Sequence, residues 1–241
     1  MVDSGLLLRL LHRAHALEPT TDACLWLTVY LCGTGRSERS LVFAEEAARI
    51  DPLSGVAAML PCWAKTFMGL RNEALPMTRQ VAARYPDDAV TRFWCGQFAA
   101  TMGADDEASA ILREVTATDL WGTVAVLYCH ALAGRAGDVQ RLVRDDAVRG
   151  LGLVDDQFAW LLAQALTAVG AHDEAIWWLR HGAERGFVNG RFVREVDQML
   201  APLRGHPDMP DLLAYMDARA AAIARAVDAD PGVAPLRSLT P

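Results

Sequence analysis

Four pairs of adjacent aspartates are residues whose type and spacing could support catalysis. They are Asp87–Asp88, Asp105–Asp106, Asp145–Asp146 and Asp155–Asp156. In an all-helical enzyme such carboxylates would hold a metal–diphosphate substrate, and that site needs acids at i and i+4 on one helix face. The stretches "DDEAS" and "DDAVT" lack the further acid. Because aspartates at a helix start cap free N–H groups and favour the positive end of the helix dipole, we interpret the pairs as helix caps.

Histidines and cysteines offer a second set of reactive groups. His12 and His15 are at i and i+3 and could ligate a metal from one helix face, but no third ligand follows at a helical spacing. Cys129 and His130 cannot pair as nucleophile and base, since neighbours on a helix point about 100° apart. The five cysteines include no C-x-x-C pair, which argues against a disulfide framework or a zinc ribbon. The sequence therefore predicts a protein that is not an enzyme, without catalytic residues, metal or cofactor.

Two further motifs have simpler interpretations. The stretch "GTGRS" at residues 33–37 is similar to a phosphate-binding loop, but it lacks the lysine and follows a helical pattern. We predict a turn there. Cys62, Cys95 and Cys129 follow one another at a nearly constant interval. We interpret them as small buried packing residues of successive first helices, with a redox sensor as the alternative.

The composition limits the class of protein. Of the 241 residues, 52% are hydrophobic, which is enough for a full core. The net charge of −7 argues against a nucleic-acid binder, which needs a basic surface to displace counterions from phosphates. No segment is apolar without interruption over roughly 18 residues, and the N-terminus does not resemble a secretory signal. We expect a cytoplasmic protein without membrane insertion.

Regularly spaced prolines and glycines indicate which helices position these residues. Prolines recur at a nearly constant interval, at Pro19, Pro52 and Pro86. Glycines recur at the same interval, at Gly69, Gly103, Gly137 and Gly170. At a fixed distance after each glycine comes a residue that opens a helical pattern: Ala74, Ala108, Leu142 and Ala175. A shared period with a constant phase predicts a repeat of about 34 residues.

Each repeat is predicted to be a helix–turn–helix. Proline cannot continue a helix and marks the end of the second helix. Glycine supplies the turn between the two helices, where a positive φ or a close approach is needed. In the stretch "AVTRFWCGQFAATMG" the apolar residues recur at intervals of three and four residues, as they do on one face of a helix. No stretch of the sequence alternates apolar and polar residues as a half-buried strand does. We therefore expect an all-α chain of about a dozen helices, each of roughly 12–15 residues.

This repeated pattern of alanine and proline positions, with a repeat length of about 34 residues, resembles the pattern of the tetratricopeptide repeat family. The resemblance implies an α-solenoid of about five antiparallel helix pairs in a single domain over residues 1–227. The expected repeats span residues 20–52, 53–86, 87–120, 121–154 and 155–188. Residues 4–17 are expected to form an N-terminal cap helix. Residues 189–227 form the C-terminal cap with a helix near 212–226, and residues 228–241 form a flexible tail.

A second resemblance concerns the end of the array. The segment "DEAIWWLRHGAERGFVNGRFVREVDQMLAPLRGHPDMPDLL", from Asp173 to Leu213, is similar to the closing part of repeat regions in bacterial signalling proteins. These include serine/threonine kinases, adenylate cyclases and winged-helix regulators. The resemblance implies a regulatory or scaffolding array, without the activity of those neighbouring domains. One of the two tryptophans in this segment, Trp177 or Trp178, must point away from the groove, because neighbours on a helix diverge.

The family geometry places the first helix of each pair on a concave face. It implies a groove rich in aromatic residues and methionine, lined by Trp26, Tyr30, Met59, Trp63, Phe67, Phe93, Gln97, Leu127, Trp160 and Gln164. Such a groove can bind a peptide or a helix of a partner protein. We therefore expect a non-enzymatic protein-binding scaffold in bacterial signalling or assembly. The alternatives are that these residues form the core between repeats, that the groove is filled by a second copy in a structural homodimer, or that the chain is the regulatory region of a larger signalling protein.

Overall fold

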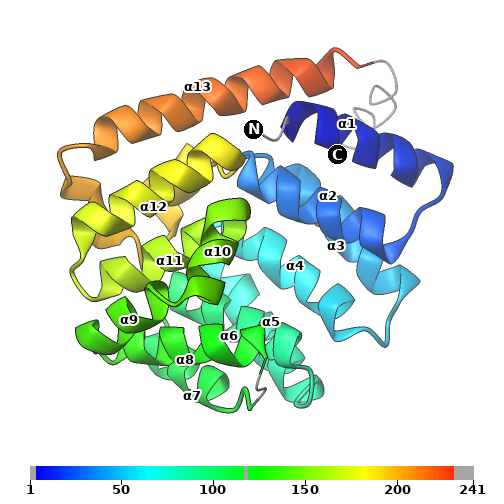
Figure 1. Ribbon diagram of the computed structural model, residues 1–241. Coiled ribbons are helices and arrows are strands. Elements are labelled where there is room, and N and C mark those ends of the chain that lie inside the picture. The colour runs from blue at the N-terminus through cyan, green and yellow to red at the C-terminus, as the bar shows by residue number, and fades with distance from the viewer. Residues whose placement is uncertain (1–3, 117–118, 231–241) are drawn as a thin grey trace.

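The computed structural model describes residues 4–116 and 119–230, and their secondary structure is entirely helical (Figure 1). The predicted all-α class is confirmed. The α-helices are α1 (Ser4–Leu17), α2 (Thr21–Gly33), α3 (Ser37–Ile50), α4 (Gly55–Met68), α5 (Arg71–Arg84), α6 (Ala89–Thr101), α7 (Asp105–Arg113), α8 (Leu120–Leu132), α9 (Ala136–Val143), α10 (Asp146–Val154), α11 (Asp156–Ala168), α12 (His172–Arg185) and α13 (Met209–Asp228). A π-helical turn, η1 (Phe192–Val196), and a 3-10 helix, η2 (Ala201–Gly205), separate α12 from α13.

The helices pack mainly against their neighbours in the sequence, as expected for paired helices. Four of the five expected repeat spans contain two helices each: α2 and α3, α4 and α5, α6 and α7, and α11 and α12. The span 121–154 differs, because α8 is followed there by two short helices, α9 and α10, of 8 and 9 residues. The helix length expected from the sequence is therefore wrong for these two helices, and it is also wrong for α7, which has 9 residues.

The predicted turn residues are correct with one exception. Pro19, Pro52 and Pro86 each lie just beyond the end of a helix, α1, α3 and α5 respectively. The glycines at 69, 103 and 170 have positive φ, of 79°, 72° and 77°. Gly137 was expected to make the corresponding turn, and this is wrong: it lies inside α9, and Gly134, with φ of 67°, makes the turn instead.

The acidic pairs are found at helix starts. Asp88 is the N-cap of α6, Asp145 of α10 and Asp155 of α11, and each accepts hydrogen bonds from backbone N–H groups of its helix. Asp105 and Asp106 lie in the first turn of α7. The capping interpretation is therefore confirmed for three of the four pairs, whereas α7 has Ala104 at its N-cap and no side-chain cap bond. The "GTGRS" stretch is the turn between α2 and α3, also as predicted.

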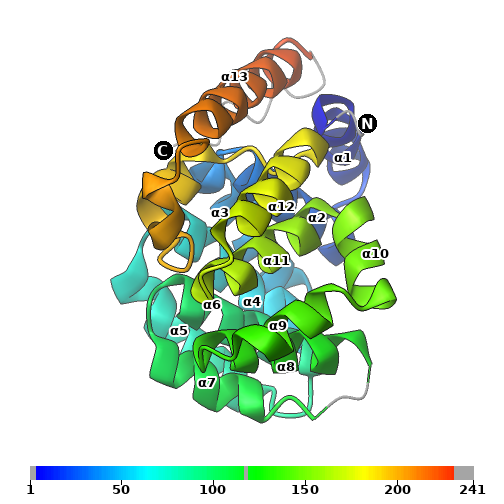
Figure 2. The same cartoon turned by 60° about the vertical axis from the view of Figure 1, so that its left-hand side comes forward.

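The two ends of the described chain meet. Helix α13 lies beside α1 at one end of the molecule in both views (Figures 1 and 2). Arg13 Nη2 contacts Asp230 Oδ2 at 3.0 Å, and Arg36 Nη2, at the start of α3, contacts Asp228 Oδ2 at 2.9 Å. The helices expected near 4–17 and 212–226 are therefore present, as α1 and the longer α13, but they pack together instead of covering two separate ends. The tail expected at 228–241 lies, from residue 231 on, outside the described residues.

Candidate functional site

Residues 187–205, between α12 and α13, cover the inner face of the array, which is formed by α2, α4, α6 and α11. We call this stretch the closing segment. It contains only η1 and η2 as regular elements. Its apolar side chains are almost completely buried: Phe187, Val188, Phe192, Val193, Leu200 and Leu203. The inner face therefore holds an irregular stretch of the same chain.

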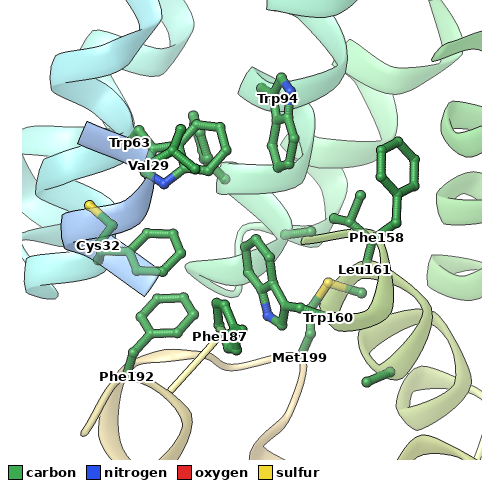
Figure 3. Close-up of a cluster of buried hydrophobic side chains, with 14 of the residues drawn as sticks. Val29, Cys32, Trp63, Trp94, Phe158, Trp160, Leu161, Phe187, Phe192 and Met199 are labelled. Atoms are coloured by element: carbon green, nitrogen blue, oxygen red, sulfur yellow. The ribbon is translucent and has the colours of Figure 1, made fainter. Parts of the chain in front are cut away.

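Stacked aromatic rings form the centre of this contact (Figure 3). Phe67 from α4 stacks on Phe192 of the closing segment, with ring centroids 4.0 Å apart and an interplanar angle of 5°. Trp160 from α11 stacks on Phe187 at 5.2 Å and 12°. Phe67 and Trp160 meet edge to face at 5.4 Å. Pairs of this kind add about 0.5–1.5 kcal/mol beyond the burial of their surface.

Backbone hydrogen bonds fix the start of the closing segment on the end of α2. The Val188 N–H donates to the Gly33 carbonyl at 2.7 Å. The Asn189 side-chain amide donates to the Cys32 carbonyl at 2.8 Å, and its own oxygen accepts the Phe192 N–H at 3.0 Å. The bonds from Val188 and Asn189 give two carbonyls in the last turn of α2 a partner from the closing segment.

A buried polar network fixes the other half of the closing segment. Asp197 Oδ2 accepts hydrogen bonds from Trp160 Nε1 at 2.9 Å and from Gln164 Nε2 at 2.8 Å. Gln164 Oε1 accepts from Gln97 Nε2 at 2.8 Å and also bonds the Tyr128 hydroxyl. Burial raises the pKa of Asp197 to about 6, while the bonds from Trp160 and Gln164 oppose the rise. The two glutamines expected on the groove therefore pair with each other inside the molecule.

The ten predicted groove residues fall into two groups. Eight of them are at most 3% exposed: Met59, Trp63, Phe67, Phe93, Gln97, Leu127, Trp160 and Gln164. The structure places these eight in the interior, where the closing segment and neighbouring helices cover them, so no open groove exists along their length. Trp26 is 42% exposed, and Tyr30 is half-buried. The role of the ten in binding a partner stays a prediction.

Tyr30, whose ring neighbours that of Trp26, lies close to two carboxyl groups at the start of α11. We call Trp26, Tyr30, Asp155 and Asp156 the mouth. The rings of Trp26 and Tyr30 are 6.0 Å apart, and Tyr30 and Asp156 line one small cleft above Trp63 and Phe67. Burial, and then the charges of Asp156 and Asp155, raise the pKa of Tyr30 to about 12. The mouth thus joins an aromatic surface to negative charge.

Asp156 has an unusual environment for a carboxyl group. Burial and the neighbouring Asp155 carboxylate raise its pKa to about 7, with Arg185 acting weakly in the other direction. A Cβ built on Gly186, at the end of α12, would lie 2.9 Å from Asp156 Oδ2 and 2.9 Å from Ser4 Oγ, so the carboxyl group packs close to the end of α12. Its raised pKa means that the carboxyl group keeps its proton to a higher pH than an ordinary aspartate does.

The histidines and cysteines have distinct surroundings. His12 is buried and has a pKa lowered to about 4, chiefly by burial and then by Arg39. His15 instead bonds Glu46 of α3, with Cys24 of α2 nearby. Sequence reasoning missed Cys24 and Glu46 because both come from other helices. No spacing within one helix could have revealed them.

The repeated cysteines and the tryptophan pair can also be placed. Cys62 and Cys95 are fully buried, and burial raises the pKa of both thiols, which confirms their role in packing. Cys129 is only half-buried. Trp178 is buried in the core, whereas Trp177 is 47% exposed and stacks on His181. Trp177 is therefore the tryptophan that points outward.

Comparison of the chain with family models, curated proteins and solved structures gave no match. Among residues 4–116 and 119–230, no helix has the length and apolar character needed to cross a membrane.

Proposed function

We propose that this chain is a non-enzymatic scaffold, a helical-repeat protein that binds a short segment of a partner protein at the mouth. The observation that carries the proposal is the exposed Trp26 next to the half-buried Tyr30, which lies close to Asp155 and Asp156, while the other eight residues of the predicted groove are covered. Exposed tryptophan and tyrosine are the residue types that most often dominate protein interfaces. The setting in bacterial signalling or assembly rests on the resemblance to tetratricopeptide arrays.

The closing segment supports this proposal by example. The inner helices hold this irregular stretch of the same chain through stacked aromatic rings and hydrogen bonds to helix ends. A partner segment at the mouth would likewise pack on aromatic rings of α2, at Trp26 and Tyr30, which precede the end of the helix that the closing segment contacts. The eight buried groove residues then act as the rigid support of the mouth, and the closing segment keeps them covered.

The chemistry of the mouth defines the kind of partner. Two aromatic faces attract apolar side chains and also cations, since the ring faces carry negative charge density. The carboxylate of Asp155 favours a lysine or arginine of the partner. We therefore expect a segment that carries an apolar side chain next to a basic residue.

The proposal is tested by affinity capture from the source lysate with three forms of the protein: wild type, Trp26→Ala and Trp177→Ala. The two tryptophans are similarly exposed but lie on different helices, α2 and α12. We expect one partner to be retained by wild type and Trp177→Ala and lost from Trp26→Ala. With that purified partner, loss of a central interface tryptophan costs about 2 kcal/mol, roughly a thirtyfold weaker Kd.

Two results would overturn the proposal. A partner retained equally by all three forms places the interface elsewhere, and so does a partner lost only from Trp177→Ala. If the captured protein is only a second copy of this chain, and the mass in solution doubles, the homodimer alternative replaces the proposed scaffold. Equal thermal unfolding of the three forms serves as the control for folding.

A further inference from the structure

Three metal-binding side chains from three helices converge at one place outside the mouth. His15 comes from the last turns of α1, Cys24 from the start of α2 and Glu46 from α3. His15 Nε2 is 2.7 Å from Glu46 Oε2, and Cys24 Sγ is 4.0 Å from the same oxygen. The three donor atoms all lie within 4.8 Å of one another. This is the only such group among the residues that the structure describes.

We propose that His15, Cys24 and Glu46 form a binding site for a zinc ion. One imidazole nitrogen, one thiolate and one carboxylate oxygen are a donor set that suits zinc. Magnesium and calcium prefer oxygen ligands alone. The mixture of soft and hard donors therefore selects a first-row transition ion, and zinc is the ion that accepts all three donors in tetrahedral geometry.

The distances are close to those of a formed site. Zinc–ligand bonds of about 2.0–2.3 Å give donor–donor edges of roughly 3.3–3.7 Å in a tetrahedron. The His15–Glu46 pair must open by several tenths of an ångström, and the sulfur must move closer by about the same amount or somewhat more. Rotation of the long Glu46 side chain, which is 22% exposed, adjusts the two edges that it shares. The edge between His15 Nε2 and Cys24 Sγ, at most 4.8 Å in the metal-free site, must close through the side-chain torsions of those two residues.

Neighbouring groups hold two of the ligands in place. The His15 ring packs edge-on against Phe43, with centroids 5.1 Å apart. Glu46 uses its other oxygen, Oε1, to bond Arg49 at 3.4 Å, which leaves Oε2 directed at His15 and Cys24. Support of this kind orients metal ligands and raises affinity. The His15 side chain is 12% exposed, so solvent reaches the site and water supplies the fourth ligand.

Metal binding requires proton release. The thiol of Cys24 gives up its proton to become a thiolate, and the proton shared between His15 and Glu46 leaves when the imidazole is charged. A bound divalent ion stabilises the thiolate, and every proton that binding releases makes binding stronger as the pH rises. Affinity is therefore expected to rise with pH.

Cobalt(II) titration of the full chain, with a non-thiol reductant, tests the site. Cobalt takes the place of zinc and reports a thiolate ligand through a near-ultraviolet charge-transfer band. We expect one equivalent to bind, zinc to displace it, and magnesium to have no effect. Because the ion ties α1, α2 and α3 together, zinc is also expected to raise the thermal unfolding midpoint.

Matched variants separate a specific site from loose binding. Cys24→Ser should abolish the charge-transfer band, whereas Cys32→Ser should retain it, since Cys32 lies on the same helix but bonds Ser40. Glu46→Gln keeps the thiol, removes a partly exposed charge and should weaken cobalt binding at least tenfold. Circular dichroism checks that each variant is folded.

Either of two results would overturn the zinc site. One is the absence of a charge-transfer band in wild type at one equivalent of cobalt. The other is a band of equal strength in wild type and folded Cys24→Ser, which would place the ion on another cysteine. If Cys24→Ser does not fold, unchanged cobalt affinity in Glu46→Gln has the same meaning. None of these results depends on whether a partner protein binds the mouth.

Discussion

Replacing Phe192 by alanine is expected to lower the free energy of unfolding by about 3–5 kcal/mol. The residue lies in the short π-helical turn η1, between α12 and α13. In a surface loop such a substitution is ordinarily tolerated. Here its ring is fully buried, stacks on Phe67 at 4.0 Å and meets Trp160 edge to face at 5.7 Å. Its removal leaves a cavity at the centre of the inner face. Urea unfolding of wild type and variant measures the difference.

The matched control for this prediction is Glu195→Ala in the same turn. Glu195 is exposed, and its carboxylate contacts only Arg191, at 3.4 Å, among the ion pairs of the described chain. An exposed pair of this kind contributes about 0–1 kcal/mol. If Phe192→Ala costs no more than Glu195→Ala, the closing segment does not form part of the core.

Asp156→Asn is expected to stabilise the protein above neutral pH. The pKa of Asp156 is raised from 3.8 to about 7 in the folded protein, so the folded state binds more protons than the unfolded state between these values. The stability contributed by the protonated carboxyl is complete below pH 4 and is lost as pH rises through about 7. Asparagine keeps the shape without the charge, and the gain at pH 8 is on the order of 2–4 kcal/mol.

Thermal or urea unfolding of both proteins at pH 8 and pH 5 measures this effect. The difference between variant and wild type should be large at pH 8 and should shrink at pH 5, where most of the wild-type carboxyl groups in the folded state are protonated. A constant difference, or a destabilised variant at pH 8, would show that the carboxylate is well solvated or paired. The same variant also removes one charge from the mouth without changing Trp26 or Tyr30.

Local patterns in the sequence predicted the helices well. Pro19, Pro52 and Pro86 each follow the end of a helix, as their spacing predicted, although Pro61 and Pro76 lie inside α4 and α5. The aspartates at 88, 145 and 155 cap helices because short carboxylates reach the free N–H groups. These effects act over a few residues, so a single sequence contains all the information they need.

Long-range packing was less accessible from the sequence. The constant period assigned the turn to Gly137, whereas the chain turns at Gly134 and inserts the extra helix α10. A constant repeat length cannot predict that one repeat contains an additional helix. The phase assigned ten residues to one groove, but it could not show that eight of them would be buried, some of them under residues 187–205. That outcome depends on contacts between residues far apart in the sequence, such as Phe67 with Phe192.

The candidate sites depend on contacts of the same kind. His15 was visible as half of an i, i+3 pair, but its contacts are Glu46 and Cys24, brought together by the packing of three helices. Likewise, the aromatic character of Trp26 and Tyr30 was visible in the sequence. The place of Tyr30 close to Asp155 and Asp156 depends on where α2 lies relative to α11.

Hydrogen exchange of two backbone amides tests most directly the claim that the inner face is covered by the chain's own closing segment. The Val188 N–H bonds the Gly33 carbonyl at 2.7 Å, and the Gln198 N–H bonds the Thr101 carbonyl at 2.9 Å. We predict that both amides exchange as slowly as those in the centres of α4 and α11, because they open only when the core opens. Exchange as fast as that of the exposed Leu53, between α3 and α4, would contradict the account and leave the inner face open to a partner.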